Sequence, residues 1–189
     1  MEKADALLAA ARADDERRRR SLLGPFVSLL VGTGCRVSEA TGLLWGIEGL
    51  NLAADPPVMH IRRETTKTVA GVRTVPLDEV TARALREHRL AMGRPGDRMP
   101  VFTRPGGLAI NRSGRVRSGL ARVAASARLD GVSPHVLRHT HATWLAAAGV
   151  PAPIAAARLG HADGGALFMR VYAHSGASDG EMALAALAE

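Results

Sequence analysis

The amino-acid sequence predicts a mainly helical α+β domain with one small three-stranded antiparallel sheet. Apolar residues recur at helical spacing over most of the chain. One block, residues 47–77, instead holds short β-branched segments separated by turn-forming residues. A length of 189 residues suits a single domain with a substantial core. We therefore expect residues 1–189 to fold as one domain.

The N-terminal part is predicted to be helical. Residues 1–20 combine regularly spaced Ala and Leu with a charged run, and the apolar residues 21–31 indicate a buried helix with Pro25 in its first turn. The glycine-rich residues 32–34 end that helix. Ser38 is expected to cap a short helix over residues 39–44, whose first turn is acidic.

The sheet is predicted from three segments, residues 47–52, 58–64 and 72–77, which are rich in β-branched side chains. Asp55-Pro56-Pro57 and Ala70-Gly71 supply the turns between them. Lys67 falls in the hairpin that joins the second strand to the third.

Helices return after Pro76. We expect them over residues 78–92, 113–128, 134–148 and 151–160, with Ser133 as the cap of the third. Val116, Leu120, Val123 and Ala127 share one face of the second of these helices. A short apolar helix, residues 179–188, is predicted in the C-terminal tail.

Composition narrows the kind of partner. The formal net charge is +7 and six arginines with no acidic residue lie between 104 and 128, which favours a polyanion such as double-stranded DNA over a merely solvated helix face. The single cysteine, Cys35, excludes an internal disulfide. There is no signal peptide and no apolar run of ~20 residues, so we expect a cytoplasmic, nucleoid-associated protein without membrane contact. The predicted phosphate-contacting residues are Arg104, Arg112, Arg115, Arg117 and Arg122.

Three motifs carry the chemistry, and together they resemble the tyrosine recombinase (phage integrase) family. Arg36 and Glu39 lie in GTGCRVSEATGLLW, and Lys67 lies in ETTKTVAGVRTVPL. The third segment contains H-x-x-R, then L-G-H, then the only tyrosine of the chain. The resemblance covers residues 22–174 and implies that family's catalytic-domain fold. It also implies site-specific DNA recombination or integration through a 3′-phosphotyrosine, without metal or cofactor.

The resemblance assigns roles residue by residue. It implies a catalytic set of Arg36, Lys67, His135, Arg138, His161 and Tyr172, with Glu39 in support. The residue types fit the chemistry, because two guanidinium forks suit the charge that builds on phosphate oxygens during transesterification. A tyrosine hydroxyl with a reference pKa of ~10 needs nearby cations or a base to attack. A lysine can protonate the departing 5′-oxygen.

Each assignment has a structural alternative. Lys67 could be an ordinary turn lysine, Arg36 a salt-bridge partner of Glu39, and the histidines of the two motifs core residues. Lysine is nevertheless rare here, with two lysines among 25 basic residues. We interpret Cys35 as a small buried hydrophobe rather than a nucleophile. A metal site built from His135, His139 and His161 lacks a completing carboxylate or cysteine, so we expect none; His139 and His141 are assigned to packing or hydrogen bonding.

The sequence departs from the family pattern in two respects. Only 35 residues precede Arg36, which leaves no room for the helical core-binding domain of most members. His161 and Tyr172 are eleven residues apart, a long spacing that Gly164-Gly165 would absorb, and this predicts a mobile tyrosine helix.

These departures leave other activities open. The resemblance implies a homotetramer on DNA, and we expect a monomer or weak oligomer in free solution, associated through the tail 178–189. The alternatives are type IB topoisomerase-like DNA relaxation and a non-catalytic DNA-binding integrase fragment. The missing clamp favours the second alternative, and the complete set of catalytic residue types opposes it.

Overall fold

The computed structural model describes residues 2–65, 71–104, 107–110 and 114–172, without the side chains of residues 115, 167, 171 and 172. Lys67, Arg112 and the tail 178–189 therefore lie outside the described residues. The elements, in chain order, are α1 (Glu2–Arg17), α2 (Leu23–Thr33), α3 (Val37–Thr41), β1 (Leu50–Asn51), β2 (Val58–Ile61), the 3-10 turn η1 (Arg63–Thr65), β3 (Arg73–Pro76), α4 (Glu79–Ala91), α5 (Arg115–Ser126), α6 (Pro134–Ala147), α7 (Ala152–Leu159) and α8 (Ala166–Tyr172). The predicted fold class is confirmed.

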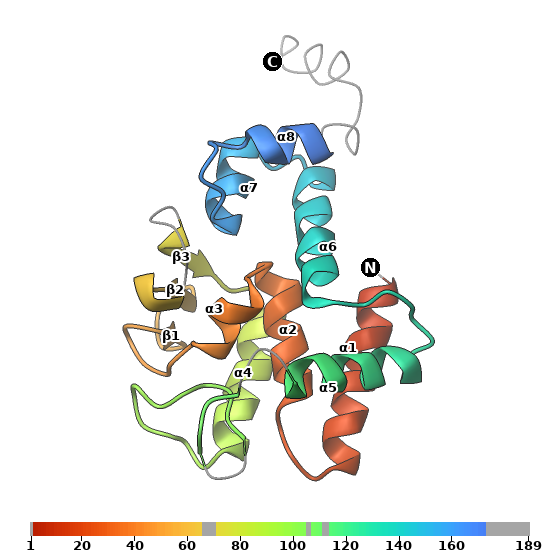
Figure 1. Ribbon diagram of the computed structural model, residues 1–189. Coiled ribbons are helices and arrows are strands. Elements are labelled where there is room, and N and C mark those ends of the chain that lie inside the picture. The colour runs from red at the N-terminus through yellow and green to blue at the C-terminus, as the bar shows by residue number, and fades with distance from the viewer. Residues whose placement is uncertain (1, 66–70, 105–106, 111–113, 173–189) are drawn as a thin grey trace.

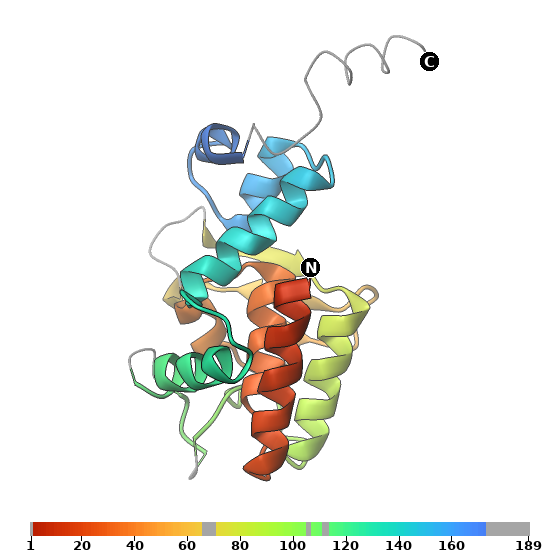
Figure 2. The same ribbon diagram turned by 90° about the vertical axis from the view of Figure 1, so that its right-hand side faces the viewer.

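Helix α2 lies at the centre of the molecule. It contacts α1, α3, α4 and α6, and Figure 2 shows α1, α2 and α4 running side by side. Nearly every residue of α2 is buried, including Phe26, Leu29 and Leu30. A helix that is apolar on all sides is stable only when neighbours cover it on all sides, and this explains its position.

The start of α2 is capped from a distance. The Asp15 carboxylate of α1 accepts hydrogen bonds from the backbone N–H groups of Leu22, Leu23 and Gly24, at 2.9, 3.0 and 2.8 Å. These donors have no partner within α2, because the first N–H groups of a helix never do. One buried aspartate therefore joins the end of α1 to the start of α2.

The sheet is confirmed with the order β1-β2-β3, and both pairings are antiparallel. Leu50, Met59 and Val75 are buried on its inner face. The strands are shorter than predicted. Residues 46–49 form a turn, in which the Leu50 N–H bonds to the Leu44 carbonyl at 2.8 Å and Ile47 is 73% exposed. The second strand stops at Ile61 because the chain then turns into η1.

The helix predicted over residues 39–44 is wrong in its start, its end and its cap, because α3 ends at Thr41. Helix α3 begins at Val37, and Arg36, not Ser38, is the N-cap residue. The Glu39 carboxylate reaches back to accept the Arg36 backbone N–H at 2.7 Å, which stabilises this earlier start. Helices α4, α5, α6 and α7 match the predicted ranges to within two residues, whereas no range was predicted for α8.

Helices α6, α7 and α8 project from the part of the molecule that holds α1 to α5 and the sheet (Figure 1). A second apolar cluster holds them together, with Ala142, Ala155, Leu159 and Phe168 buried in it. Phe168 attaches α8, which ends at Tyr172, to the other two helices. None of the helices within the described ranges is long and apolar enough to cross a lipid bilayer.

Candidate active site

The candidate active site is built around the C-terminal end of α7. Gly160 adopts a left-handed conformation with φ of 69°, and its N–H bonds to the Ala157 carbonyl at 3.1 Å. The N–H of His161 bonds to the Ala156 carbonyl at 3.0 Å. This pair of bonds is a Schellman motif, which satisfies two of the carbonyls that a helix end leaves open.

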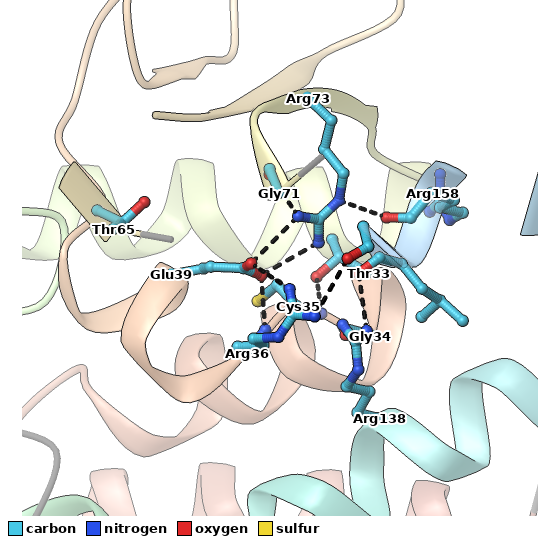
Figure 3. Close-up of polar contacts among 12 residues, drawn as sticks. Thr33, Gly34, Cys35, Arg36, Glu39, Thr65, Gly71, Arg73, Arg138 and Arg158 are labelled. Atoms are coloured by element: carbon cyan, nitrogen blue, oxygen red, sulfur yellow. Dashed lines mark hydrogen bonds and ion pairs between the residues drawn. The ribbon is translucent and has the colours of Figure 1, made fainter. Parts of the chain in front are cut away.

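Three arginine side chains donate hydrogen bonds to the next carbonyls at this helix end, those of residues 158–160. Arg73 Nε donates to the Arg158 carbonyl at 2.7 Å. Arg138 Nη2 donates to the Leu159 carbonyl at 2.7 Å, and Arg36 Nη2 donates to the Gly160 carbonyl at 3.1 Å. The three side chains come from β3, α6 and the residue before α3, and Figure 3 shows them converging. The negative end of the α7 dipole offsets part of the repulsion between them.

Glu39 supplies the full negative charge of this cluster. Its side chain has no exposed surface and accepts two hydrogen bonds from Arg73, each of 3.1 Å, and one from Arg36 Nη1 of 3.0 Å. Burial would raise the pKa of Glu39, but the hydrogen bonds and charge of Arg73, followed by the backbone and side-chain hydrogen bonds of Arg36, outweigh it and lower the pKa. Glu39 is therefore ionised at neutral pH.

Within the described residues, Arg138 donates its hydrogen bonds to backbone carbonyls only. Its Nη1 donates to the Gly34 carbonyl at 2.8 Å, in addition to the bond to Leu159. Burial, followed by the charge of Arg36, lowers the pKa of Arg138 to about 10. The guanidinium stays charged at pH 7, in a site where another anion would be favourable.

His161 directly follows this helix end. Burial lowers its pKa, and the charge of Arg138 lowers it further. Its Nδ1 is buried and has no hydrogen-bond partner within the described part of the chain. A buried polar atom without a partner costs about 1–3 kcal/mol, so this nitrogen is available to a partner outside the described residues.

A second set of hydrogen bonds, made by Arg158, joins α7 to residues of other elements. Arg158 donates to the carbonyls of Pro76 and Gly32 and, through Nε, to His141 Nε2, each at 3.1 Å. His141 Nδ1 lies 2.9 Å from the Val31 carbonyl, so Nδ1 carries the proton and Nε2 is the acceptor. Burial, followed by the charge of Arg158, lowers the pKa of His141 to about 4. The predicted hydrogen-bonding role of His141 is confirmed.

Of the other predicted catalytic residues, His135 has a described side chain, and no hydrogen bond or ion pair within the described residues joins it to this cluster. His135 is exposed in the first turn of α6, one turn before Arg138. Tyr172 is the last residue of α8, whose backbone packs on α6 and α7, and its side chain is not described. Lys67 belongs to the segment between β2 and β3 that is not described.

The arginines predicted to contact DNA differ in their surroundings. Arg104 and Arg117 are exposed. Arg122 is paired within the protein, because its Nε and Nη2 each lie 2.9 Å from an oxygen of Asp14. This bidentate pair raises the pKa of Arg122 and lowers that of Asp14. Asp14 also pairs with Arg17, Arg18 and Arg20, so one carboxylate is shared by four arginines and Arg122 remains a predicted DNA contact.

Cys35 is fully buried, and burial raises its pKa to about 12, which makes its thiol a poor nucleophile. Its placement agrees with the interpretation as a small buried hydrophobe. Within the described ranges, no group of three His, Cys, Asp or Glu side chains is arranged to hold a metal ion.

Sequence reasoning missed Arg73 and Arg158. Arg73 has a recognisable signal, since it lies two residues before the buried Val75 and therefore on the inner face of its strand. An arginine at an inward strand position needs buried partners. Arg158 directly precedes L-G-H on an alanine-rich helix and carries no comparable local signal.

With this geometry in place, comparison with known proteins gives the family. A sequence profile of the phage integrase family matches residues 1–178. The chain belongs to this family.

Its relatives are named recombinases. The chain is 35% identical to tyrosine recombinase XerC of Pelobacter propionicus over 133 residues, which cover 70% of this chain and 41% of that protein. It is 31% identical to tyrosine recombinase XerD of Caulobacter vibrioides over 167 residues, covering 84% of this chain and 52% of that protein. The chain thus spans about half the length of these relatives.

Solved structures show the same fold. XerA recombinase superposes with a TM-score of 0.72 at 24% identity, covering 96% of this chain and 59% of that one. The catalytic domain of bacteriophage HP1 integrase superposes with a TM-score of 0.65 at 23% identity, covering 97% of this chain and 90% of that one.

Proposed function

We propose that this chain is the catalytic domain of a site-specific DNA recombinase that cuts and rejoins DNA through a covalent 3′-phosphotyrosine at Tyr172. The observation that carries the proposal is the convergence of Arg36, Arg138 and His161 on one helix end. Two guanidinium groups held by hydrogen bonds, and a histidine whose buried Nδ1 has no partner within the described residues, form a site with the donors that a phosphodiester needs.

The proposed step is a transesterification. The Tyr172 oxygen attacks the phosphorus, the bond from phosphorus to the 5′-oxygen breaks, and a 3′-phosphotyrosine forms. The phenolic proton passes to a base, for which His135 is placed on the exposed first turn of α6. The leaving 5′-oxygen takes a proton from Lys67. Rejoining reverses these steps and needs no ATP, because the phosphotyrosine conserves the energy of the broken bond.

The arginine cluster would act on the phosphate itself. Arg36 and Arg138 each donate two of the five N–H groups of their guanidinium to partners within the described residues. The remaining donors can bind the two non-bridging oxygens, where charge grows in the transition state. His161, neutral because its pKa is lowered, can add a further hydrogen bond.

Double-stranded DNA is the proposed partner. One structural neighbour is a transposon integrase that was solved in complex with transposon DNA. In this chain the exposed Arg104 and Arg117 would contact the DNA backbone, with Arg112 and Arg115 beside them in sequence. Exchange of two duplexes requires four strand cleavages, so we propose a homotetramer on DNA and a monomer or weak oligomer in free solution. A protein acting on genomic DNA would work in the cytoplasm, at the nucleoid.

The test is trapping of the covalent intermediate. The protein is incubated in excess EDTA with nicked duplexes, drawn from sequences flanking its own gene, whose cleaved end is lost by diffusion. A denaturing gel then compares wild type with Tyr172→Phe. We expect a protein–DNA band in wild type only. A band that persists in Tyr172→Phe would overturn the nucleophile, and no band in either protein would favour a DNA-binding fragment.

A further inference from the structure

We infer that Arg73 is a positioning residue, which holds Arg36 in its place through Glu39. The inference rests on the proposed function, because it concerns the same phosphate-binding arginines. Arg73 lies in the second sequence motif, ETTKTVAGVRTVPL, but the resemblance assigned it no role.

The contacts of Arg73 mark it as an anchor. Its side chain is 8% exposed. Its fork meets both oxygens of Glu39 at 3.1 Å, while Nη1 also donates to the Gly71 carbonyl at 2.8 Å and Nε to the Arg158 carbonyl at 2.7 Å. A buried guanidinium with this many protein partners is held in one orientation and has little capacity to bind a substrate.

Glu39 transmits that position to Arg36. The carboxylate accepts the backbone N–H of Arg36 at 2.7 Å and its Nη1 at 3.0 Å. The Arg36 side chain is 38% exposed, and it also donates through Nη2 to the Gly160 carbonyl at 3.1 Å. Glu39 is therefore the charged partner of this half-exposed side chain, and Arg73 fixes Glu39 (Figure 3).

Arg138 provides an internal comparison. It reaches the same helix end, but its hydrogen bonds to the described residues go to the carbonyls of Gly34 and Leu159 and none goes to Glu39. Loss of Arg73 should therefore loosen Arg36 and leave Arg138 in place. A general loss of structure would affect both arginines.

The activity test uses Arg73→Gln and Arg73→Lys, with Arg83→Gln as the control. Arg83 is exposed on α4 and forms an ion pair with Glu87, one turn further along the same helix. We expect Arg73→Gln to lower the rate of covalent-complex formation at saturating DNA by about ten-fold or more, with half-saturation changed less than about two-fold. Arg73→Lys should recover part of the rate, because it restores the charge without the fork. Arg83→Gln should match wild type, and wild-type rates in both Arg73 variants would overturn the inference.

The pH profile separates positioning from simple stability. Glu39 is faced by Arg73 from β3, Arg36 from the start of α3, Arg138 from α6 and the buried Cys35. Removing Arg73 takes away the largest influence that lowers the pKa of Glu39. The rate of covalent-complex formation in Arg73→Gln should then rise with pH as Glu39 loses its proton. In wild type the same titration should be complete at a lower pH. An unchanged profile would count against the inference.

A second readout does not depend on activity. Arginine Nε–H signals of ¹⁵N-labelled protein are assigned through Arg36→Lys and Arg138→Lys, and their relaxation is compared in wild type and the Arg73 variants. We expect the Arg36 signal to show faster motion in both variants while the Arg138 signal is unchanged. An unchanged Arg36 signal overturns the inference. If wild type forms no covalent complex, the proposed function fails and this measurement still decides the position of Arg36. If Arg73→Gln does not fold, Arg73→Lys decides.

Discussion

Acidification should weaken the fold through His141, the buried acceptor of the Arg158 hydrogen bond. The structure lowers the pKa of this ring from 6.5 to about 4. A histidine with a lowered folded-state pKa stabilises the fold fully above pH 6.5, and this contribution is lost as the pH falls from 6.5 towards 4. The unfolded chain binds the proton first in that window. Integrating the proton linkage from pH 7.5 to pH 5 gives a loss of about 2 kcal/mol from this group.

The assay is urea unfolding at pH 7.5, 6 and 5, applied to wild type, His141→Gln and the control His60→Gln. His60 lies on β2 and its ring contacts the Thr74 hydroxyl at 2.9 Å. Other buried histidines, such as His88, titrate in every protein and cancel in the comparison. We expect His141→Gln to be less stable at pH 7.5 but to lose about 2 kcal/mol less than wild type on acidification. Equal losses in wild type and His141→Gln would refute the assigned tautomer and the buried Arg158–His141 contact.

Three further predictions concern the helix ends and the buried carboxylate. Gly160→Ala should lower the free energy of unfolding in urea more than Gly149→Ala. Both glycines have φ of 69°, where a Cβ costs about 1 kcal/mol. Only the Cβ at 160 would also lie 2.6 Å from Arg73 Nη1. Gly160→Ala should also slow covalent-complex formation, whereas Gly149→Ala should not. Asp15→Ala should destabilise by about 2 kcal/mol in urea, because three N–H groups lose their acceptor. Glu39→Gln should destabilise by about 3–5 kcal/mol at pH 7, because it leaves buried guanidinium groups uncompensated.

Much of the fold followed from local patterns. Helices with strong caps and long apolar faces, such as α4 with Asp78 and α6 with Ser133, were predicted to within one residue, because their limits depend on neighbouring residues. Local signals failed where a residue outside the helix, or the choice between two neighbouring side chains, determines the first residue of the helix. The start of α2 depends on Asp15, eight residues before Leu23. The start of α3 depends on the Glu39 carboxylate, which the sequence alone did not distinguish from the Ser38 hydroxyl.

The candidate site shows the same limit. Motifs located Arg36, Arg138 and His161, because the residue types and spacings reflect the chemistry directly. Arg73 and Arg158, which sequence reasoning missed, form hydrogen bonds to backbone carbonyls of segments far away in the chain. Arg122 shows the same limit. Its basic stretch predicted a DNA contact, which stays a prediction, but could not indicate its ion pair with Asp14, 108 residues earlier.

The charge balance of the cluster links its structure to the proposed chemistry. Arg36, Arg73 and Arg138 bring three positive charges, while Glu39 supplies one negative charge and the end of α7 about half of another. The cluster is left with an excess of positive charge in a partly buried place, where solvent screening is weak. In the proposed reaction a phosphodiester would bring one negative charge, which would grow on the non-bridging oxygens as Tyr172 attacks. The excess positive charge would then be reduced most in the transition state, so that binding energy would be directed to the reaction step rather than to the ground state.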